Sequence, residues 1–287
     1  MVENFSPRPL WRKAVFRRTA LTLAAFAVAA VFAGPFLWMI LTSLKGPKEI
    51  FVTPVRLFPT MGWYWQAYLE VWQKGNFSRY FLNSVFVASA TTAISVLISV
   101  MAGLGFARYK LPGRNWLMLC ILVSQLFPLV LLVPPFYVVM RNLGILDKHL
   151  SLIIAYTSFA LPYSVWMLTG YFRSIPIDLE EAAMIDGCTR FDAYLRVTLP
   201  LAAPGIVATV IYCFILAWNE FLFATTFIST PANRTLPLGL QAFIGQYQVD
   251  WNLLMAGAVV TTLPVVILFV VLQRYLVAGL TAGAMKG

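Results

Sequence analysis

The segment from Asp178 to Leu201 reads DLEEAAMIDGCTRFDAYLRVTLPL, and it separates two long apolar stretches of the chain. Acidic residues dominate its first half, and Gly187 stands between two runs with helical spacing. We predict a short helix with Asp178 as its N-cap, paired with Glu181 in a capping box. Gly187 would end this helix in the left-handed C′ position, where glycine carries little steric cost.

A second helical pattern follows from Thr189 or Arg190. The side chains that recur at steps of three and four, and so share one face, are Phe191, Tyr194, Leu195 and Thr198. Pro200 and Pro204 are then predicted to break the chain before the next apolar stretch. The segment therefore reads as helix, glycine turn, helix and proline exit.

This segment has two interpretations. It is either a surface hairpin that joins two membrane spans, or a docking element for a partner protein. The small residues Ala182 and Ala183 would allow a partner to approach closely, and Gly187 would let the backbone pass near another surface.

The rest of the sequence is that of an integral membrane protein. Of its 287 residues, 60% are hydrophobic and 11% are charged, whereas soluble domains carry about 25% charged residues. Apolar runs of the roughly 20 residues that a helix needs to cross the hydrocarbon are predicted at Thr19–Thr42, Asn83–Phe106, Trp116–Met140, Leu150–Phe172, Gly205–Phe227 and Leu253–Leu272. We therefore predict an all-α integral membrane protein with six transmembrane helices. Bends are predicted at Pro128, Pro134, Pro135, Pro162 and Pro264.

The basic residues predict the orientation of the chain. Residues 1–18 read as a cytoplasmic N-terminal tail before an uncleaved first span, and residues 278–287 as a cytoplasmic C-terminal tail. Residues 19–277 would form the transmembrane domain, with the acidic loop at 174–201. More than half of the 21 Lys and Arg residues then lie inside, as the positive-inside rule requires. These residues flank spans rather than forming a run, which excludes nucleic acid as a partner and leaves membrane lipid.

The sequence holds no motif for covalent chemistry. It lacks a G-x-x-x-x-G-K-[S/T] P-loop, H-E-x-x-H and G-x-S-x-G. Its single histidine, His149, is predicted to be a solvated loop residue. We expect this chain to have no catalytic residue, no metal and no cofactor of its own.

Glu220, in the stretch AWNEFLFA, is the one acidic residue well inside a predicted span. It could pair with the polar residues of the spans and hold helices together; these residues are Asn83, Gln125 and Asn219. Alternatively, Asn219 and Glu220 face a solute path, because an ionisable residue inside the membrane is a functional candidate. Trp218 is the third candidate for such a path.

The string EEAAMIDGCTRFDAYLRVTLPL resembles the EAA loop of ABC importer permeases, whose pattern is E-A-A-x-x-D-G, a hydrophobic spacer and L-P. The matching residues are Glu181, Ala182, Ala183, Asp186, Gly187, Leu199 and Pro200. Cys188 departs from the usual alanine, and its small size predicts no loss of docking. Other stretches resemble the carbohydrate, maltose-type branch of this family; they include PFLWMILTSLK, FLNSVFVA, FALPYSVWML, AWNEFLFA and AGLTAGAMKG.

The resemblance implies the type I ABC importer permease fold and one half of the translocation pathway of an ATP-driven, binding-protein-dependent sugar importer. The substrate would be an oligosaccharide or a related polyol or glycerol phosphodiester. It also implies a second EAA-type permease, two cytoplasmic subunits that bind ATP and Mg, and an extracytoplasmic solute-binding protein. The location would be a bacterial or archaeal plasma membrane.

The resemblance further assigns regions of the chain. The acidic loop would be the coupling helix in a groove of the ATPase, with Glu181 and Gly187 transmitting motion. The outer segment Ser229–Asn252 would contact the solute-binding protein, and residues 278–287 would lie near the ATPase.

Two other functions compete with the importer. A stand-alone secondary carrier would use an ion gradient and would carry an inverted repeat, but the sequence shows no convincing internal repeat. A membrane enzyme acting on lipid would carry clustered catalytic side chains at one interface, and the sequence shows no such cluster. The importer is therefore the favoured function.

Overall fold

A computed structural model describes residues 10–74, 76–245 and 249–284, and within them regular structure is helical apart from one isolated bridge. The helices long and apolar enough to span a membrane are α1 (Leu10–Ser43), α3 (Phe77–Arg108), α6 (His149–Ser174) and α13 (Trp251–Ala284). Two bent helix pairs bring the total to six when each pair counts as one span. The all-α prediction is confirmed, and the six predicted apolar regions fall on these four helices and on parts of the two bent pairs.

The third predicted span is not one helix. It consists of α4 (Arg114–Val123) with the 3-10 turn η1 (Ser124–Leu126), followed after a 100° bend by α5 (Leu129–Asn142). Phe127 is extended at the bend, because a residue before proline avoids the helical region. The other prolines predicted to bend spans lie inside helices instead; these are Pro134, Pro135, Pro162 and Pro264.

The fifth predicted span is also interrupted. Helix α10 (Ala203–Asn219) ends where Glu220 becomes extended, and the short helix α11 (Leu222–Phe227) follows. A second bend, of 71°, separates α10 from the helical run Arg190–Leu201. Pro204 stands in the first turn of α10, where its missing N–H costs nothing. The continuous helix predicted for this region is therefore wrong.

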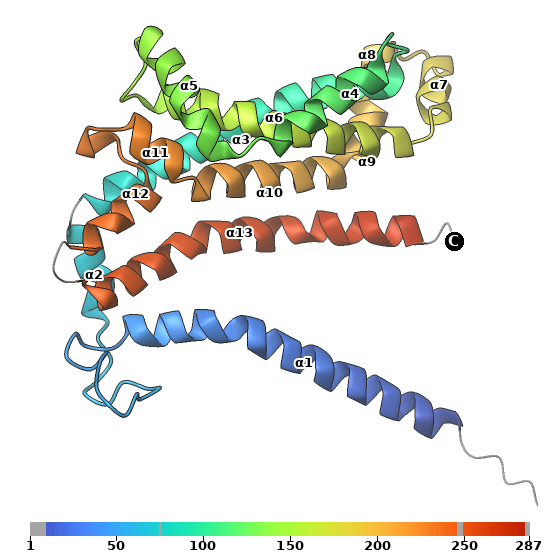
Figure 1. Ribbon diagram of the computed structural model, residues 1–287. Coiled ribbons are helices and arrows are strands. Elements are labelled where there is room, and N and C mark those ends of the chain that lie inside the picture. The colour runs from blue at the N-terminus through green and yellow to red at the C-terminus, as the bar shows by residue number, and fades with distance from the viewer. Residues whose placement is uncertain (1–9, 75, 246–248, 285–287) are drawn as a thin grey trace, which may run out of the picture.

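Figure 1 shows α3, α6 and α10 lying alongside one another, with α13 beneath them and α1 diverging below. The short helices α2 (Gln66–Gln73), α11 and α12 (Leu236–Leu240) lie at one end. Helices α7 (Asp178–Ile185) and α8 (Arg190–Ala193) lie at the other end, where α13 finishes. The acidic segment and the last described residues thus share one end of the bundle.

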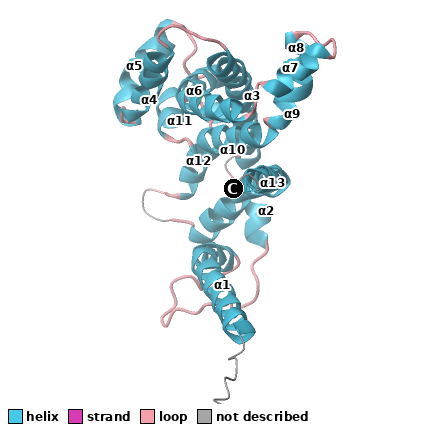
Figure 2. Cartoon of the chain, turned by 90° about the vertical axis from the view of Figure 1, so that its right-hand side faces the viewer, coloured by secondary structure: helices cyan, strands magenta, loops and turns pink. Residues whose placement is uncertain are grey.

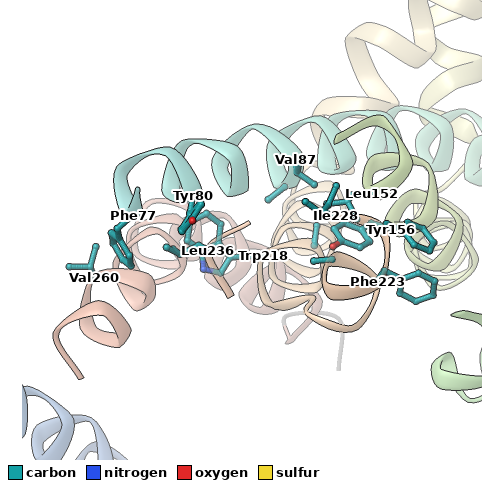
Figure 3. Close-up of a cluster of buried hydrophobic side chains, with 14 of the residues drawn as sticks. Phe77, Tyr80, Val87, Leu152, Tyr156, Trp218, Phe223, Ile228, Leu236 and Val260 are labelled. Atoms are coloured by element: carbon teal, nitrogen blue, oxygen red, sulfur yellow. The ribbon is translucent and has the colours of Figure 1, made fainter. Parts of the chain in front are cut away.

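Two clusters of buried side chains form the core. The larger one joins α3, α6, α10, α11 and α13 towards the end that carries α12 (Figure 3). At its centre the indole N–H of Trp218 donates to Thr261 O at 3.1 Å, and its ring stacks on Phe214. The smaller cluster lies beneath the acidic segment and comprises Leu168, Phe172, Ile175 and Ala202.

Helices α3 and α6 approach closely because α3 presents small side chains to its neighbours. Its buried small residues are Ser84, Ala88, Thr91, Thr92, Ser95, Ser99 and Gly103. A Cβ on Gly103 would lie only 3.0 Å from Leu168 Cβ and 3.2 Å from Thr169 N. Small residues at such contacts let helix backbones pack tightly in membranes, so the α3–α6 pair forms a compact unit.

A similar approach at the start of α10 gives a testable prediction. A Cβ on Gly205 would lie 2.5 Å from Cγ of the Tyr171 ring, so Gly205→Ala should destabilise the fold by about 1–3 kcal/mol through overpacking. The thermal unfolding midpoint in detergent measures this loss. Gly170→Ala is the matched control, because no atom lies within 4 Å of its Cβ position. Equal midpoints for the two variants would contradict the packing.

The outer 5–6 segment predicted at Ser229–Asn252 is fastened to the loop before α6; residues 246–248 lie outside the described part. The Asp147 carboxylate accepts from the Ser229 and Thr230 amides at 3.0 and 2.9 Å, and also from the Thr230 hydroxyl. The hydroxyl and the amide of Thr230 hold the pKa of Asp147 below its ordinary value. The start of this segment is thus fixed in place.

Candidate coupling site

Helix α7 begins one residue earlier than predicted. Ile177 is its N-cap, and the amides of Glu180 and Glu181 donate to Ile177 O at 2.9 and 3.1 Å. Asp178 is then the first helical residue, so the predicted capping box between Asp178 and Glu181 is wrong. Its carboxylate still suits the positive end of the helix dipole.

The capping box occurs at the next helix instead. The Thr189 hydroxyl accepts from the Asp192 amide at 3.1 Å, and the Asp192 carboxylate accepts from the Thr189 amide at 3.3 Å. This confirms the predicted start of the second helix at Thr189 or Arg190.

Gly187 adopts the left-handed conformation predicted for it, with φ +94°. Its amide donates to Met184 O at 3.1 Å, and the Cys188 amide donates to Ala183 O at 3.0 Å. These two bonds form a Schellman motif, which satisfies the last carbonyls of α7. No atom lies within 4 Å of a Cβ at Gly187, so the demand for glycine here comes from the backbone conformation alone.

The second half of the segment is one helical run with a wider turn in its middle. Helix α8 continues into the π-helical turn η2 (Tyr194–Thr198) and then α9 (Leu199–Leu201). The Leu199 amide donates to Tyr194 O, five residues back. Pro200 lies within this run, so the break predicted at Pro200 is displaced to Ala202.

Within the acidic segment, the acidic side chain that the protein buries is Glu180. Its carboxylate Oε1 accepts from Arg108 Nε at 2.7 Å and from the Thr198 hydroxyl at 2.7 Å. The side chains of Arg108 and Glu180 are 7% and 5% exposed. Glu181 is exposed, so two adjacent glutamates face opposite environments.

Arg108 also binds the end of α6. Its Nη1 donates to Phe172 O at 2.8 Å, and its Nη2 donates to Ile175 O at 3.1 Å. The planar guanidinium thus uses three of its donors in three directions, which an ammonium group could not reproduce. One side chain at the end of α3 therefore joins α6 and α7.

From the sequence, Arg108 is predicted only to be one of the basic residues on the inside, and Glu180 only to suit the positive end of the helix dipole. Ala183 and Met184 follow Glu180 at three and four residues, so the three share one face of α7; Glu180 is buried, and the other two are half-buried. Glu181 instead shares its face with Ile185, which is 87% exposed. Because Ile185 is apolar, the sequence suggested that the face of Glu181 was the buried one.

The predicted EAA residues do not all share one surface. Glu181, Ala182, Asp186 and Pro200 are exposed, Ala183 is half-buried, and Leu199 packs against the smaller core cluster. Apolar side chains extend the exposed surface, since Leu179 is 44% and Phe191 is 68% exposed. Figure 2 shows α7 and α8 projecting beyond the bundle. An exposed apolar patch on a projecting, well-capped hairpin is typical of a protein interaction site.

The candidates for a solute path lie in different environments. Trp218 is buried in the larger core cluster, whereas Asn219 is exposed and donates to Ile215 O of its own helix at 3.1 Å. The Glu220 carboxylate accepts from the Tyr156 hydroxyl at 2.6 Å. It also accepts from the amides that begin α11, those of Phe223 and Ala224, at 2.8 and 3.2 Å.

The polar residues of the spans do not pair with one another, which corrects that interpretation. Asn83 donates to Ala232 O and Arg234 O, both at 2.9 Å, and Gln125 donates to Phe159 O at 3.1 Å. They join segments through backbone carbonyls instead.

His149 was also predicted wrongly. It is half-buried, and its Nε2 lies 3.0 Å from Asn233 O.

Comparison with known proteins matches residues 95–282 to the family described as binding-protein-dependent transport system inner membrane component. The chain belongs to this family. It is 43% identical over 256 residues to a sulfoquinovosyl glycerol transport system permease protein of Agrobacterium fabrum, covering 88% of each chain. It is 34% identical to a trehalose/maltose transport system permease protein of Thermococcus litoralis, covering 96% of this chain and 99% of that one. The protein is thus a permease component of an ABC importer and not an enzyme.

The fold agrees with this family. A crystal structure of a bacterial ABC transporter involved in alginate import superposes with a TM-score of 0.74 and 22% identity. The match covers 95% of this chain and 99% of that one. The predicted type I permease fold is confirmed, and the family description places the protein in an inner membrane.

Proposed function

We propose that this chain is one of two permease subunits of an ATP-driven sugar importer, and that the segment from α7 to α9 docks on its cytoplasmic ATPase subunits. The chain contributes half of the translocation pathway. The sequence holds no P-loop, so ATP and Mg bind to the partner ATPase. Both termini and the docking segment face the cytoplasm, and the end that carries α11 and α12 faces the solute-binding protein.

The observation that carries the docking role is the two-sided construction of α7. One side is fastened to the bundle by the buried Glu180, while the other presents Glu181, Ala182 and Ile185 to the outside. A helix that merely joined two spans would not need a buried ion pair, a Schellman turn and an exposed isoleucine together. A docking surface on a rigid hairpin needs all three.

The substrate class follows from the named relatives. One relative is named for sulfoquinovosyl glycerol and another for trehalose and maltose, and each of these compounds contains a glycosidic bond. We assign to this chain an oligosaccharide or a related polyol or glycerol phosphodiester. The outer segment fastened by Asp147 is the surface assigned to the solute-binding protein.

Ile185→Asp tests the docking surface. Ile185 is 87% exposed, so the isolated chain should fold as before. In the complex, an unpaired carboxylate buried in an apolar groove costs several kcal/mol, and each 1.4 kcal/mol lowers an association constant about tenfold. We expect the yield of ATPase that co-purifies with the tagged chain to fall by more than about tenfold.

The matched control is Leu143→Asp. Leu143 is 61% exposed and follows α5 at the far end of the protein, so its ATPase yield should equal that of the wild type. Full ATPase recovery with Ile185→Asp would place the docking surface elsewhere.

A further inference from the structure

The junction beneath α7 is built around a buried ion pair. In the described part of the chain, Glu180 and Arg108 form the one ion pair that is buried on both sides, and the second pair, Lys74 with Glu70, is largely exposed. The junction is not itself part of the docking surface, because Glu180 is buried on the opposite side of α7.

The junction ties together segments that are distant in the sequence. Arg108 ends α3, Glu180 lies in the first turn of α7, and Thr198 closes the π-helical turn η2. The same guanidinium holds the terminal carbonyls of α6, Phe172 O and Ile175 O. Phe172 and Ile175 are themselves buried in the smaller core cluster, so the hydrogen bonds are anchored in packed side chains on the transmembrane side.

We propose that Arg108 is a positioning residue that fastens the docking segment to the α3–α6 pair, so that α7, α3 and α6 move as one rigid unit when the ATPase subunits close. Charge-assisted bonds are short, directional and roughly twice as strong as neutral ones. A buried junction of this kind has one preferred geometry. A displacement of α7 is therefore passed on to α3 and α6, whereas a flexible loop in the same place would absorb the displacement. This inference rests on the docking role proposed above.

The alternative is that the junction only helps the chain to fold. Removing Arg108 alone would leave Glu180 buried and unpaired, and such a variant would fail to fold under either account. The informative variant is therefore the double substitution Arg108→Met with Glu180→Met, because apolar side chains of similar volume replace buried ion pairs without loss of stability in other proteins. It removes the junction and keeps the volume.

The experiment measures one distance in the assembled complex in nanodiscs. Spin labels are placed at Ile177, the N-cap of α7, and at Met101 on α3, which are 49% and 68% exposed, in a chain whose three cysteines are replaced. Distances are recorded without nucleotide and after trapping with ATP and vanadate. For the chain with its junction intact, we expect one narrow distribution that trapping does not change.

For the double variant, we expect trapped nucleotide at the level of the intact chain, together with loss of the narrow distribution after trapping. Arg108→Lys keeps the positive charge but not the planar guanidinium group. It should therefore widen the distance distribution after trapping, but less than the double variant does. The control is Arg114→Met, since Arg114 donates to Phe106 O at 3.4 Å and takes part in neither ion pair. It should behave like the intact chain.

An unchanged distribution in the double variant, with nucleotide trapped, would overturn the proposal. Failure of the docking role has a different signature, because no ATPase would then be present and vanadate would trap no nucleotide in any variant. Lower thermal stability of the double variant without a change in the trapped distance would also count against the proposal, because it would show a folding role alone.

Discussion

Gly187→Val should leave the chain folded in membranes and abolish the coupling of ATP hydrolysis to uptake. The variant places a β-branched side chain at φ +94°, which costs of the order of 1–3 kcal/mol. No atom obstructs the new Cβ, so the bundle itself is not disturbed. The strain is relieved by breaking the Schellman bonds to Met184 O and Ala183 O, and α7 then loses its fixed angle to α8.

Two measurements on the purified complex check this result. ATP hydrolysis should persist, while uptake of the solute that co-purifies with the binding protein should be lost. Gly187→Asn should retain most uptake, because asparagine tolerates the left-handed region. Gly144→Val is the control, since Gly144 has φ +67° and open space at the far end of the protein. Normal uptake with Gly187→Val would contradict the proposal that α7 transmits motion.

Glu220→Ala should cause a large loss of stability. The carboxylate accepts one hydrogen bond from Tyr156 and two from the amides that begin α11. Hydrogen bonds to a charged group contribute about 1.5–3 kcal/mol each, and the amides would be left without this partner. We expect a marked fall in the thermal unfolding midpoint and in the yield of folded chain.

Companion variants separate structure from transport. Tyr156→Phe removes one of the three bonds, so its midpoint should fall less than that of Glu220→Ala. Asn219→Ala should leave the midpoint nearly unchanged, because Asn219 is exposed and bonds within its own helix. If Glu220→Ala kept the wild-type midpoint and lost uptake, Glu220 would belong to the solute path instead.

The apolar regions of the fold were predictable because the length of each apolar run can be counted in the sequence. The positions at which the helices bend or end within these regions were not predictable. Pro128 and Pro162 are both prolines in apolar runs, yet only Pro128 stands at a sharp bend. The break at Glu220 depends on Tyr156, which is 64 positions away. Whether a helix bends at a polar residue is decided by partners that periodicity does not reveal.

Some features of the candidate site were likewise predictable from the sequence, and others were not. The left-handed Gly187 followed from the local rule for helix ends, whereas the residues proposed for docking rest on the resemblance of the motif. The buried pair did not follow, because Arg108 and Glu180 lie 72 positions apart. The helix start was misplaced by one residue, since Ile177 rather than Asp178 takes the cap. This error hid the fact that Glu180, and not Glu181, turns towards the protein.

The most direct test of the account is a photo-cross-link from the tip of α7. A photoreactive amino acid replaces Ile185 in the tagged chain, which is irradiated in its native membranes and purified, and the attached protein is sequenced. The docking role predicts one principal partner that carries a G-x-x-x-x-G-K-[S/T] P-loop, and no such partner from the same group placed at Leu143. Cross-links from Ile185 to lipid or to copies of this chain alone would contradict it.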